Sequence, residues 1–318
     1  MTRIAANLLL LLVAVIWGSA FVPQIHGMAD VGPMTFTGVR FVIGALVVTP
    51  LMWLEWRALA RSGRPLHASD ALKIAGLGSL LLLGAAMQQI GLMTSTATNA
   101  GFLTALYVPL VPVLAWILWR QLPHWSVWVG ALACIAGAYL LSGAQRLAIV
   151  PGDLWVIGSA IPWAVHVLLV GRVADRMAAP FLVAGGQFAV CGLLALLWTA
   201  GFEPVSWSGL QAAAWPIAYT GVFSVGIAFT AQVVAQRYAH AADAAIVLSS
   251  ETLFAALFGF LLMGDRLTAT GVAGCSLIFA SMMGVQLLPM LQKNKRVHSA
   301  PHPAPRALRA AGAGVEEH

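Results

Sequence analysis

Charged residues are scarce in this chain. Asp, Glu, Lys and Arg make up 9% of its 318 residues and hydrophobic residues 60%, and the mean hydropathy is +0.87. So few charges cannot cover the water-exposed surface of a globular domain. The composition therefore excludes a soluble protein and predicts an integral membrane protein.

Signatures of metal, cofactor and nucleotide sites are missing as well. The three cysteines are an odd number, and each lies in a hydrophobic run, which argues against disulfides and a metal site. The sequence has no GxxxxGK[ST] phosphate loop, no HExxH and no paired acids across a plausible cleft. We therefore expect no enzyme, no cofactor and no ATP bound by this chain.

Hydrophobic runs of about 20 residues, the length of a membrane-crossing helix, follow one another along the chain. Continuous runs favour helices over a spanning β-barrel, whose strands would be shorter and alternate in hydropathy. An all-α integral membrane protein is therefore predicted. Its ten transmembrane helices are expected at residues 4–24, 33–54, 71–92, 98–119, 125–143, 153–171, 180–200, 211–234, 242–263 and 268–289.

Lysine and arginine gather on alternate links between these spans. With the N-terminus inside, fourteen of the seventeen fall on the cytoplasmic side, two outside and Arg40 within a span. We therefore expect both termini in the cytoplasm and a bacterial-type cytoplasmic (inner) membrane.

The net charge of +6 does not indicate nucleic acid, because the basic residues lie in links and in a tail. That tail, residues 291–318, is expected to be a disordered, basic cytoplasmic segment.

An internal repeat divides the spans into two sets. Ile16-Trp17 matches Pro162-Trp163 at a separation of 146 residues, Arg40-Phe41 matches Gln187-Phe188 at 147, and further pairs fall near the same offset. Five-helix halves at 1–145 and 146–290 are predicted. Because five is odd, the halves are inverted in the membrane, and a central cavity is expected between them.

Three motifs carry a family resemblance over residues 4–290. They are the run Ile16 to Phe21 (IWGSAF), Arg40-Phe41, and the run Gly264 to Thr268 (GDRLT). With ten spans in two inverted halves, the chain resembles the EamA-type ten-helix exporters of the drug/metabolite transporter superfamily. It departs from them at Asp265, where the family usually has Glu. The resemblance implies efflux of small metabolites by alternating access, and it is strongest to exporters of aromatic and other neutral amino acids.

Glu251 is the one acid placed well inside a predicted span, about 15 Å from the inner surface. A charge at that depth costs on the order of 3 kcal/mol or more, so such residues face a bundle interior or a wet cavity. Glu251 is predicted either to bind a substrate ammonium group or coupling proton, or to be a structural acid hydrogen-bonded to a neighbouring helix.

Other polar and aromatic residues fall inside or at the ends of spans. Each has a structural alternative, as core packing, a hydrogen-bonded core histidine or a helix-linking amide. The predicted cavity residues are Trp17, Ser19, Tyr107, Trp163, His166, Ser249, Ser250 and Glu251. Gate or structural polar residues are predicted at Arg40, Gln88, Gln89, Asn99, Gln187 and Gln232.

These features predict a secondary transporter that exports neutral, above all aromatic, amino acids or similar small metabolites. Its expected partners are a small-molecule substrate and the lipid bilayer, with no nucleic acid, and the chain is expected to be a monomer. Two alternatives remain open. One is an intramembrane enzyme or lipid-handling protein acting on a headgroup, and the other is a carrier of drugs or nucleotide sugars.

Overall fold

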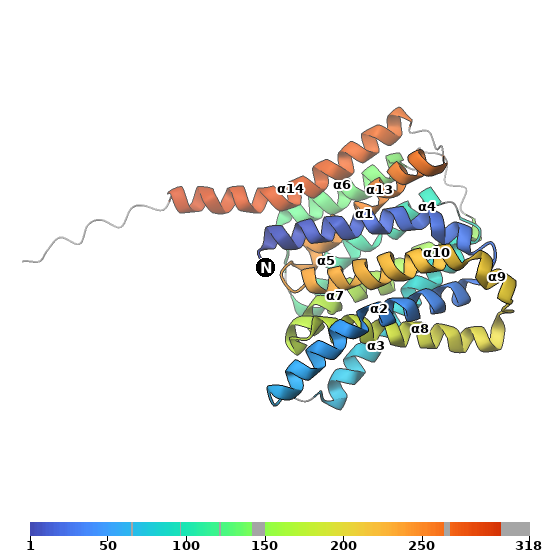
Figure 1. Cartoon of the computed structure of the whole chain (residues 1–318). Helices are drawn as coiled ribbons and strands as arrows, with labels where there is room; N and C mark the ends of the chain where they lie inside the picture. Colours follow the sequence, from blue (N-terminus) through green and yellow to red (C-terminus); the bar gives the residue numbers. More distant parts are fainter. Residues whose placement is uncertain (65, 96, 121, 142–149, 264–267, 300–318) are drawn as a thin grey trace, which may run out of the picture.

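The computed structural model describes residues 1–299 except 65, 96, 121, 142–149 and 264–267, and this part of the chain is all-helical (Figure 1). The first half contains α1 (Arg3–Gly27), α2 (Pro33–Arg61), α3 (Ala68–Leu92), α4 (Ala97–Thr104), α5 (Tyr107–Trp119) and α6 (Trp125–Leu141). The second half contains α7 (Pro151–Met177), α8 (Pro180–Phe202), α9 (Trp207–Ala212), α10 (Ala214–Tyr219), the π-helix η1 (Thr220–Phe229), α11 (Thr230–Ala235), α12 (Ala241–Leu248), α13 (Glu251–Phe258), the π-helix η2 (Gly259–Met263) and α14 (Ala269–Ser299).

Each of the ten predicted spans coincides with one helix or with consecutive helices. Within the described residues, seven stretches are long and apolar enough to cross a membrane, including the continuous runs Ala214–Ala235 and Ala241–Leu262. The shorter apolar helices Tyr107–Trp119, Trp125–Leu140 and Ala269–Ser281 account for the other three spans. The predicted all-α membrane fold is therefore confirmed.

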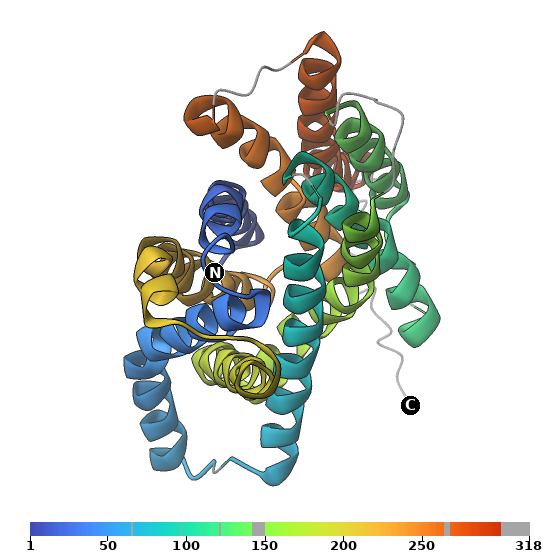
Figure 2. The ribbon, with the colours of Figure 1, turned by 90° about the vertical axis from the view of Figure 1, so that its right-hand side faces the viewer.

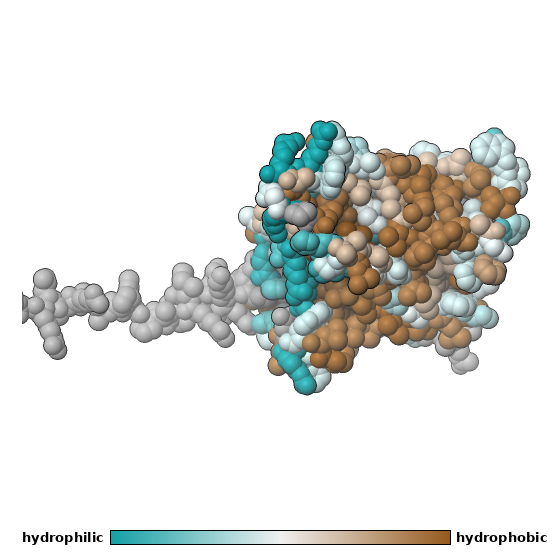
Figure 3. All heavy atoms as spheres, turned by 90° about the horizontal axis from the view of Figure 1, so that it is seen from below, coloured by the Kyte–Doolittle hydropathy of each residue, from teal (hydrophilic) through white to brown (hydrophobic). Residues whose placement is uncertain are grey.

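Apolar side chains cover the flanks of the bundle. Leucines on several helices are mostly exposed, among them Leu46, Leu132 and Leu197. Figure 3 shows a hydrophobic belt along the molecule and hydrophilic residues gathered at its left-hand end. The N-terminus lies at that same end (Figure 1). This distribution suits a protein whose flanks face lipid.

The helix α2 packs against α8, its counterpart in the predicted repeat. Near one end Gly38 faces Leu196, and near the other Gly185 faces Met52, so the two helices run antiparallel. Two equivalent helices can pack antiparallel about a symmetry axis only if that axis is perpendicular to them. The contact is therefore the geometry of an inverted repeat with its axis in the membrane plane.

The remaining helices follow the same symmetry. The last helices of the halves, α6 and α14, also pack antiparallel, and the Ser281 hydroxyl donates to the Gly130 carbonyl at 2.6 Å. The contact of α3 with α7 is repeated by that of α1 with α10, η1 and α11. In the end-on view of Figure 2, α1 lies between the yellow α10–η1–α11 segment and the orange α13. Most of the packing between helices thus joins one half to the other.

Two glutamates bind α2 and α8 together at opposite ends. The Glu203 carboxylate accepts hydrogen bonds from the backbone N–H groups of Met34 and Thr35, at 2.9 and 2.8 Å. The Glu55 carboxylate accepts one from the backbone N–H of Leu182 at 2.7 Å. Helix N-termini carry unpaired N–H groups and a partial positive charge, which a carboxylate neutralises. Each helix therefore caps the start of its partner.

The fourth and ninth predicted spans are both interrupted near their middle. The first break, between α4 and α5, and the second, between α12 and α13, lie at equivalent positions of the repeat. In both, backbone bonds tighten to the i to i−3 pattern, as from Val108 N–H to Ala105 and from Thr252 N–H to Ser249. At the second break the hydroxyls of Ser249 and Ser250 donate to backbone carbonyls of their own helix.

The last helix is longer than predicted. Disorder was expected from residue 291, but α14 continues to Ser299. Residues 291–299 contain no proline, and Leu, Gln, Lys and Arg are good helix formers. The first proline after Pro289 is Pro301, so nothing in the sequence ends the helix earlier. The part of the predicted tail from 300 to 318 lies outside the described residues, as does most of the GDRLT motif.

Candidate functional site

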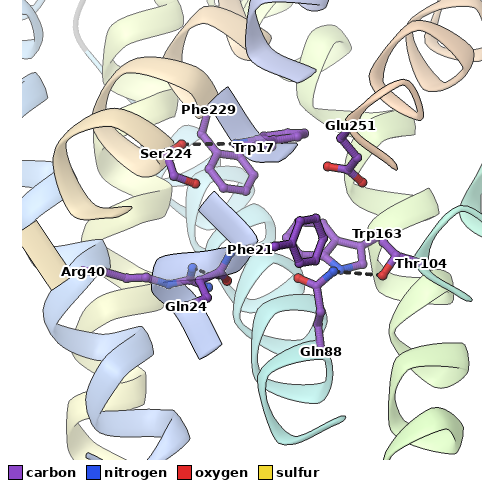
Figure 4. Close-up of a pocket in the computed structure, with 10 residues that line it drawn as sticks. All are labelled: Trp17, Phe21, Gln24, Arg40, Gln88, Thr104, Trp163, Ser224, Phe229 and Glu251. Atoms are coloured by element: carbon purple, nitrogen blue, oxygen red, sulfur yellow. Dashed lines mark hydrogen bonds between the residues drawn. The ribbon is translucent and has the colours of Figure 1, made fainter. Parts of the chain in front are cut away.

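A cavity of about 50 Å³ lies between the two halves (Figure 4). Both halves contribute to it, through α1 to α4 of the first and α7, η1 and α13 of the second. Its lining residues are Trp17, Phe21, Gln24, Arg40, Gln88, Thr104, Trp163, Ser224, Phe229 and Glu251.

Aromatic rings form one wall of this cavity. The ring of Phe229 lies 4.5 Å from that of Trp17 and 6.0 Å from that of Trp163, centroid to centroid, and it is stacked on the latter. Behind it lie the buried rings of Phe41 and Phe188, at 5.9 and 6.1 Å. Such a wall binds apolar or aromatic groups and excludes water from them.

The backbone fixes where the two indoles lie. The Trp17 indole N–H donates to the Ser224 carbonyl at 3.2 Å, on the π-helix η1. The Trp163 ring lies against Gly84 of α3, where an added Cβ would approach its Cε2 to 2.9 Å. A π-helix is rare and often occurs at functional sites. The two tryptophans, which are equivalent in the repeat, are thus held in different ways.

At one end of the cavity lies the guanidinium of Arg40, which is 5% exposed. It donates to the side-chain oxygen of Gln24 at 2.7 Å and, weakly, to that of Gln89 at 3.5 Å. It also lies 5.5 and 5.2 Å from the ring centroids of Phe36 and Phe41. Among the described residues no carboxylate forms an ion pair with it. Among the described residues, Arg40 is therefore a buried cation stabilised by hydrogen bonds and ring contacts with neutral side chains.

Glu251 lies on the other side of the cavity (Figure 4). It is the first residue of α13, directly after the break in the ninth span, and is 7% exposed. Its carboxylate makes no hydrogen bond or ion pair with any residue that the structure describes. The structural alternative, an acid hydrogen-bonded to a neighbouring helix, has no contact to support it here.

Five of the other predicted cavity residues do not line this cavity. Ser19 bonds the Ile16 carbonyl and lies 2.7 Å from the Tyr219 hydroxyl. The buried Tyr107 hydroxyl donates to the Ala245 carbonyl at 3.3 Å. His166 is fully buried, with its Nε2 at 2.8 Å from the Gln187 side-chain oxygen. The hydroxyls of Ser249 and Ser250 turn back to their own helix.

The amide residues predicted as gate or structural groups lie at different positions in the structure. Gln88 lines the cavity and donates to the Thr104 hydroxyl at 2.9 Å. Gln89 is fully buried and donates to the Met28 sulfur. Gln232 is buried in α11 with no partner for its side-chain oxygen in the described chain. Asn99 belongs to α4, but its side chain lies outside the described residues.

Five lining residues were not predicted: Phe21, Gln24, Thr104, Ser224 and Phe229. Phe21 and Gln24 stand four and seven positions after Trp17, so helical spacing places all three on one face. That spacing was available in the sequence. Ser224 and Phe229 lie in the π-helix η1, which shifts the register of its side chains, and no sequence signal marked Thr104 of α4.

The matching family agrees with this architecture. The profile of the EamA-like transporter family matches residues 4–143 and again residues 150–287. The chain belongs to the EamA-like transporter family. The resemblance to the drug/metabolite transporter superfamily is thereby confirmed, and so is the expectation of a transporter rather than an enzyme.

Curated relatives carry the same kind of name. The chain is 30% identical to an uncharacterized transporter of Archaeoglobus fulgidus, over 90% of this transporter and 87% of that protein. It is 22% identical to the uncharacterized transporter YwfM of Bacillus subtilis, over 90% and 95%. A solved crystal structure at 20% identity has a TM-score of 0.73 and covers 94% of this transporter and 100% of that chain, which shows the shared fold.

Proposed function

We propose that this transporter is an exporter of neutral amino acids, aromatic ones among them, or of similar small metabolites across the cytoplasmic (inner) membrane. The observation that carries the proposal is a pair of opposite charges across one aromatic-walled cavity. Arg40 has no carboxylate partner, and Glu251 has no cationic partner, in the part of the chain that is described. A zwitterion supplies both missing partners in one molecule.

The expected contacts follow from the chemistry of the two groups. A guanidinium binds a carboxylate through two parallel hydrogen bonds, so Arg40 would take the substrate carboxylate. Glu251 would take the ammonium group. A buried charge without a partner is costly, and substrate binding would offset that cost at both ends. The rings of Trp17, Trp163 and Phe229 would then contact the substrate side chain.

Transport is proposed to proceed by alternating access. The two halves, 1–145 and 146–290, would rock against each other around the cavity, as inverted repeats do in many secondary transporters. The excess of lysine and arginine at the end holding the N-terminus supports a cytoplasmic location for both termini. Cavity residues from both halves in one chain suit a monomer.

Counterflow in proteoliposomes tests the proposal. Vesicles loaded with unlabelled L-phenylalanine are expected to accumulate labelled L-phenylalanine, L-tryptophan and L-leucine. Phenylpropionate, which lacks the ammonium, and phenethylamine, which lacks the carboxylate, are expected to compete poorly. Absence of counterflow for every amino acid in a broad panel would falsify the proposal. Equal competition by both analogues would remove the zwitterion argument.

A further inference from the structure

A second hollow, here called the vestibule, opens at the end of the bundle that holds the N-terminus. Its volume is about 570 Å³, against about 50 Å³ for the central cavity. It is bounded by the N-terminus of α1, the α5–α6 link, α7 and the α11–α12 link. Its charged and polar lining includes Arg3, Asp175, Gln236, Arg237, His240 and Asp243.

Size separates the two hollows. Sites for small molecules commonly enclose about 300–1,000 Å³, and a water molecule needs roughly 10–15 Å³ of free volume. The central cavity as it stands has room for a few waters, whereas the vestibule has room for a whole amino acid. A substrate molecule would therefore fit the vestibule before the central cavity widens.

Two buried polar atoms of residues that line the vestibule have no hydrogen-bond partner in the described chain. Gln236, 5% exposed, donates its amide N–H to the Val167 carbonyl at 3.2 Å, and its buried Oε1 has no partner among the described residues. The buried Nε of Arg237 likewise has no hydrogen bond there and lies 3.8 Å from an Asp175 oxygen. An amide oxygen and a carboxylate suit an ammonium group, and a guanidinium N–H suits a carboxylate.

The helix α7 connects the vestibule to the central cavity. Trp163 lines the cavity, and Val167, Leu168 and Gly171, one to two turns further along the same helix, line the vestibule. One turn of an α-helix is about 5.4 Å. Leu168 belongs to the apolar part of the vestibule wall, where a substrate side chain would lie. The two hollows thus stand in sequence along one helix.

We propose that the vestibule is a second binding site for amino-acid zwitterions, at which substrate is held before it enters the central cavity. The carboxylate binds Arg237, and the ammonium group binds Asp175 and the Gln236 side-chain oxygen. The inference rests on the proposed function, because the ligand class is the same at both sites.

Equilibrium binding of labelled L-phenylalanine to the purified full chain in detergent tests the inference. Two molecules per chain are expected for the natural sequence. Arg237→Gln and, as a second variant in case the first fails to fold, Asp175→Asn are each expected to reduce this to one. Arg176→Gln removes the same charge from an exposed residue next to Asp175 that does not line the vestibule, and is expected to keep two.

The outcomes separate the two proposals. One molecule per chain, retained in Arg237→Gln and Asp175→Asn but lost in Glu251→Gln, overturns the vestibule site and leaves the proposed function standing. One molecule lost in Arg237→Gln but retained in Glu251→Gln supports the vestibule and removes substrate binding from Glu251. No binding together with no counterflow of any amino acid overturns the proposed function itself.

Discussion

The breaks in the fourth and ninth spans share a backbone geometry and differ in the side chain at the start of the next helix. After the first break comes Tyr107, whose buried hydroxyl donates to the Ala245 carbonyl of the other half. After the second comes Glu251, whose carboxylate faces the cavity with no partner in the described chain. Tyr107 therefore joins the two halves through a hydrogen bond, whereas Glu251, at the equivalent position, presents its carboxylate to the cavity. Duplication can preserve a scaffold while the chemistry at matching positions diverges.

The largest expected effect is that of Glu251→Gln. Removing one partner of a buried charge pair costs about 2–5 kcal/mol, so uptake of L-phenylalanine at low concentration is expected to fall roughly 100-fold. Because the carboxylate makes no hydrogen bond with a described residue, and its burial as a charge is costly, the thermal unfolding temperature is not expected to fall. If Glu251 also carries a coupling proton, the variant will lose the pH dependence of uptake. Unchanged uptake with unchanged pH dependence would make the carboxylate structural.

Next in size is Arg40→Gln, which places at position 40 the residue found at its counterpart, Gln187. The loss of a two-bond carboxylate contact is expected to raise the KM for L-phenylalanine about 30-fold. Inhibition by phenethylamine, which has no carboxylate, is expected to change little. If Arg40→Gln weakens the binding of L-phenylalanine and of phenethylamine equally, Arg40 supports the cavity rather than binding the substrate.

A smaller and more selective effect is expected from Gly84→Ala. The new methyl group would meet the Trp163 ring at 2.9 Å, so the indole has to move toward the cavity. Transport of L-tryptophan is expected to fall about tenfold relative to L-alanine, the scale of size discrimination in an apolar pocket. Gly76→Ala on the same helix is the matched control, because nothing lies within 4 Å of its added Cβ. Equal changes in the two glycine variants would show that Gly84 does not set the width of the cavity.

The smallest effect is expected from Tyr107→Phe. It removes one neutral hydrogen bond to the Ala245 carbonyl, and the free energy of unfolding is expected to fall by about 1 kcal/mol. Transport kinetics are expected to stay within about twofold of the natural chain. A loss of transport as large as that of Glu251→Gln would mean that both breaks take part in binding, and the contrast between them would be lost.

The sequence was sufficient for the spans and the repeat, because hydropathy, odd span number and paired motifs are properties of the chain alone. Counting residues along each helix also predicted inward positions for Trp17, Trp163, Arg40 and Glu251, and these four residues line one cavity. The direction in which each side chain points around its helix axis was harder to predict. Counting 1.5 Å per residue places Tyr107 near mid-span. The break before it, however, turns its side chain toward the interface between the two halves, where its hydroxyl donates to the Ala245 carbonyl.

Side-chain direction was equally hard to predict for two cavity residues in the second half of the chain. Phe229 and Ser224 belong to the π-helix η1, whose extra residue per turn changes which side chains share a face. An α-helical count through this segment places them wrongly. The absence of an ion-pair partner for Glu251 and for Arg40 among the described residues, and their place on one cavity, depend on neighbouring helices, so they could be seen only once the fold was known.

The two glutamate caps on α2 and α8 have a consequence for how such a chain could arise. Glu55 and Glu203 are separated by 148 residues, and the N–H groups that they cap, of Leu182 and Thr35, by 147. A single glutamate in one unduplicated five-helix protein could make both contacts, each subunit capping the other in a self-complementary pair. The contacts between α2 and α8 are thus those that a homodimer with two oppositely inserted copies would make, and within one chain the opposite insertion of the two halves is permanent.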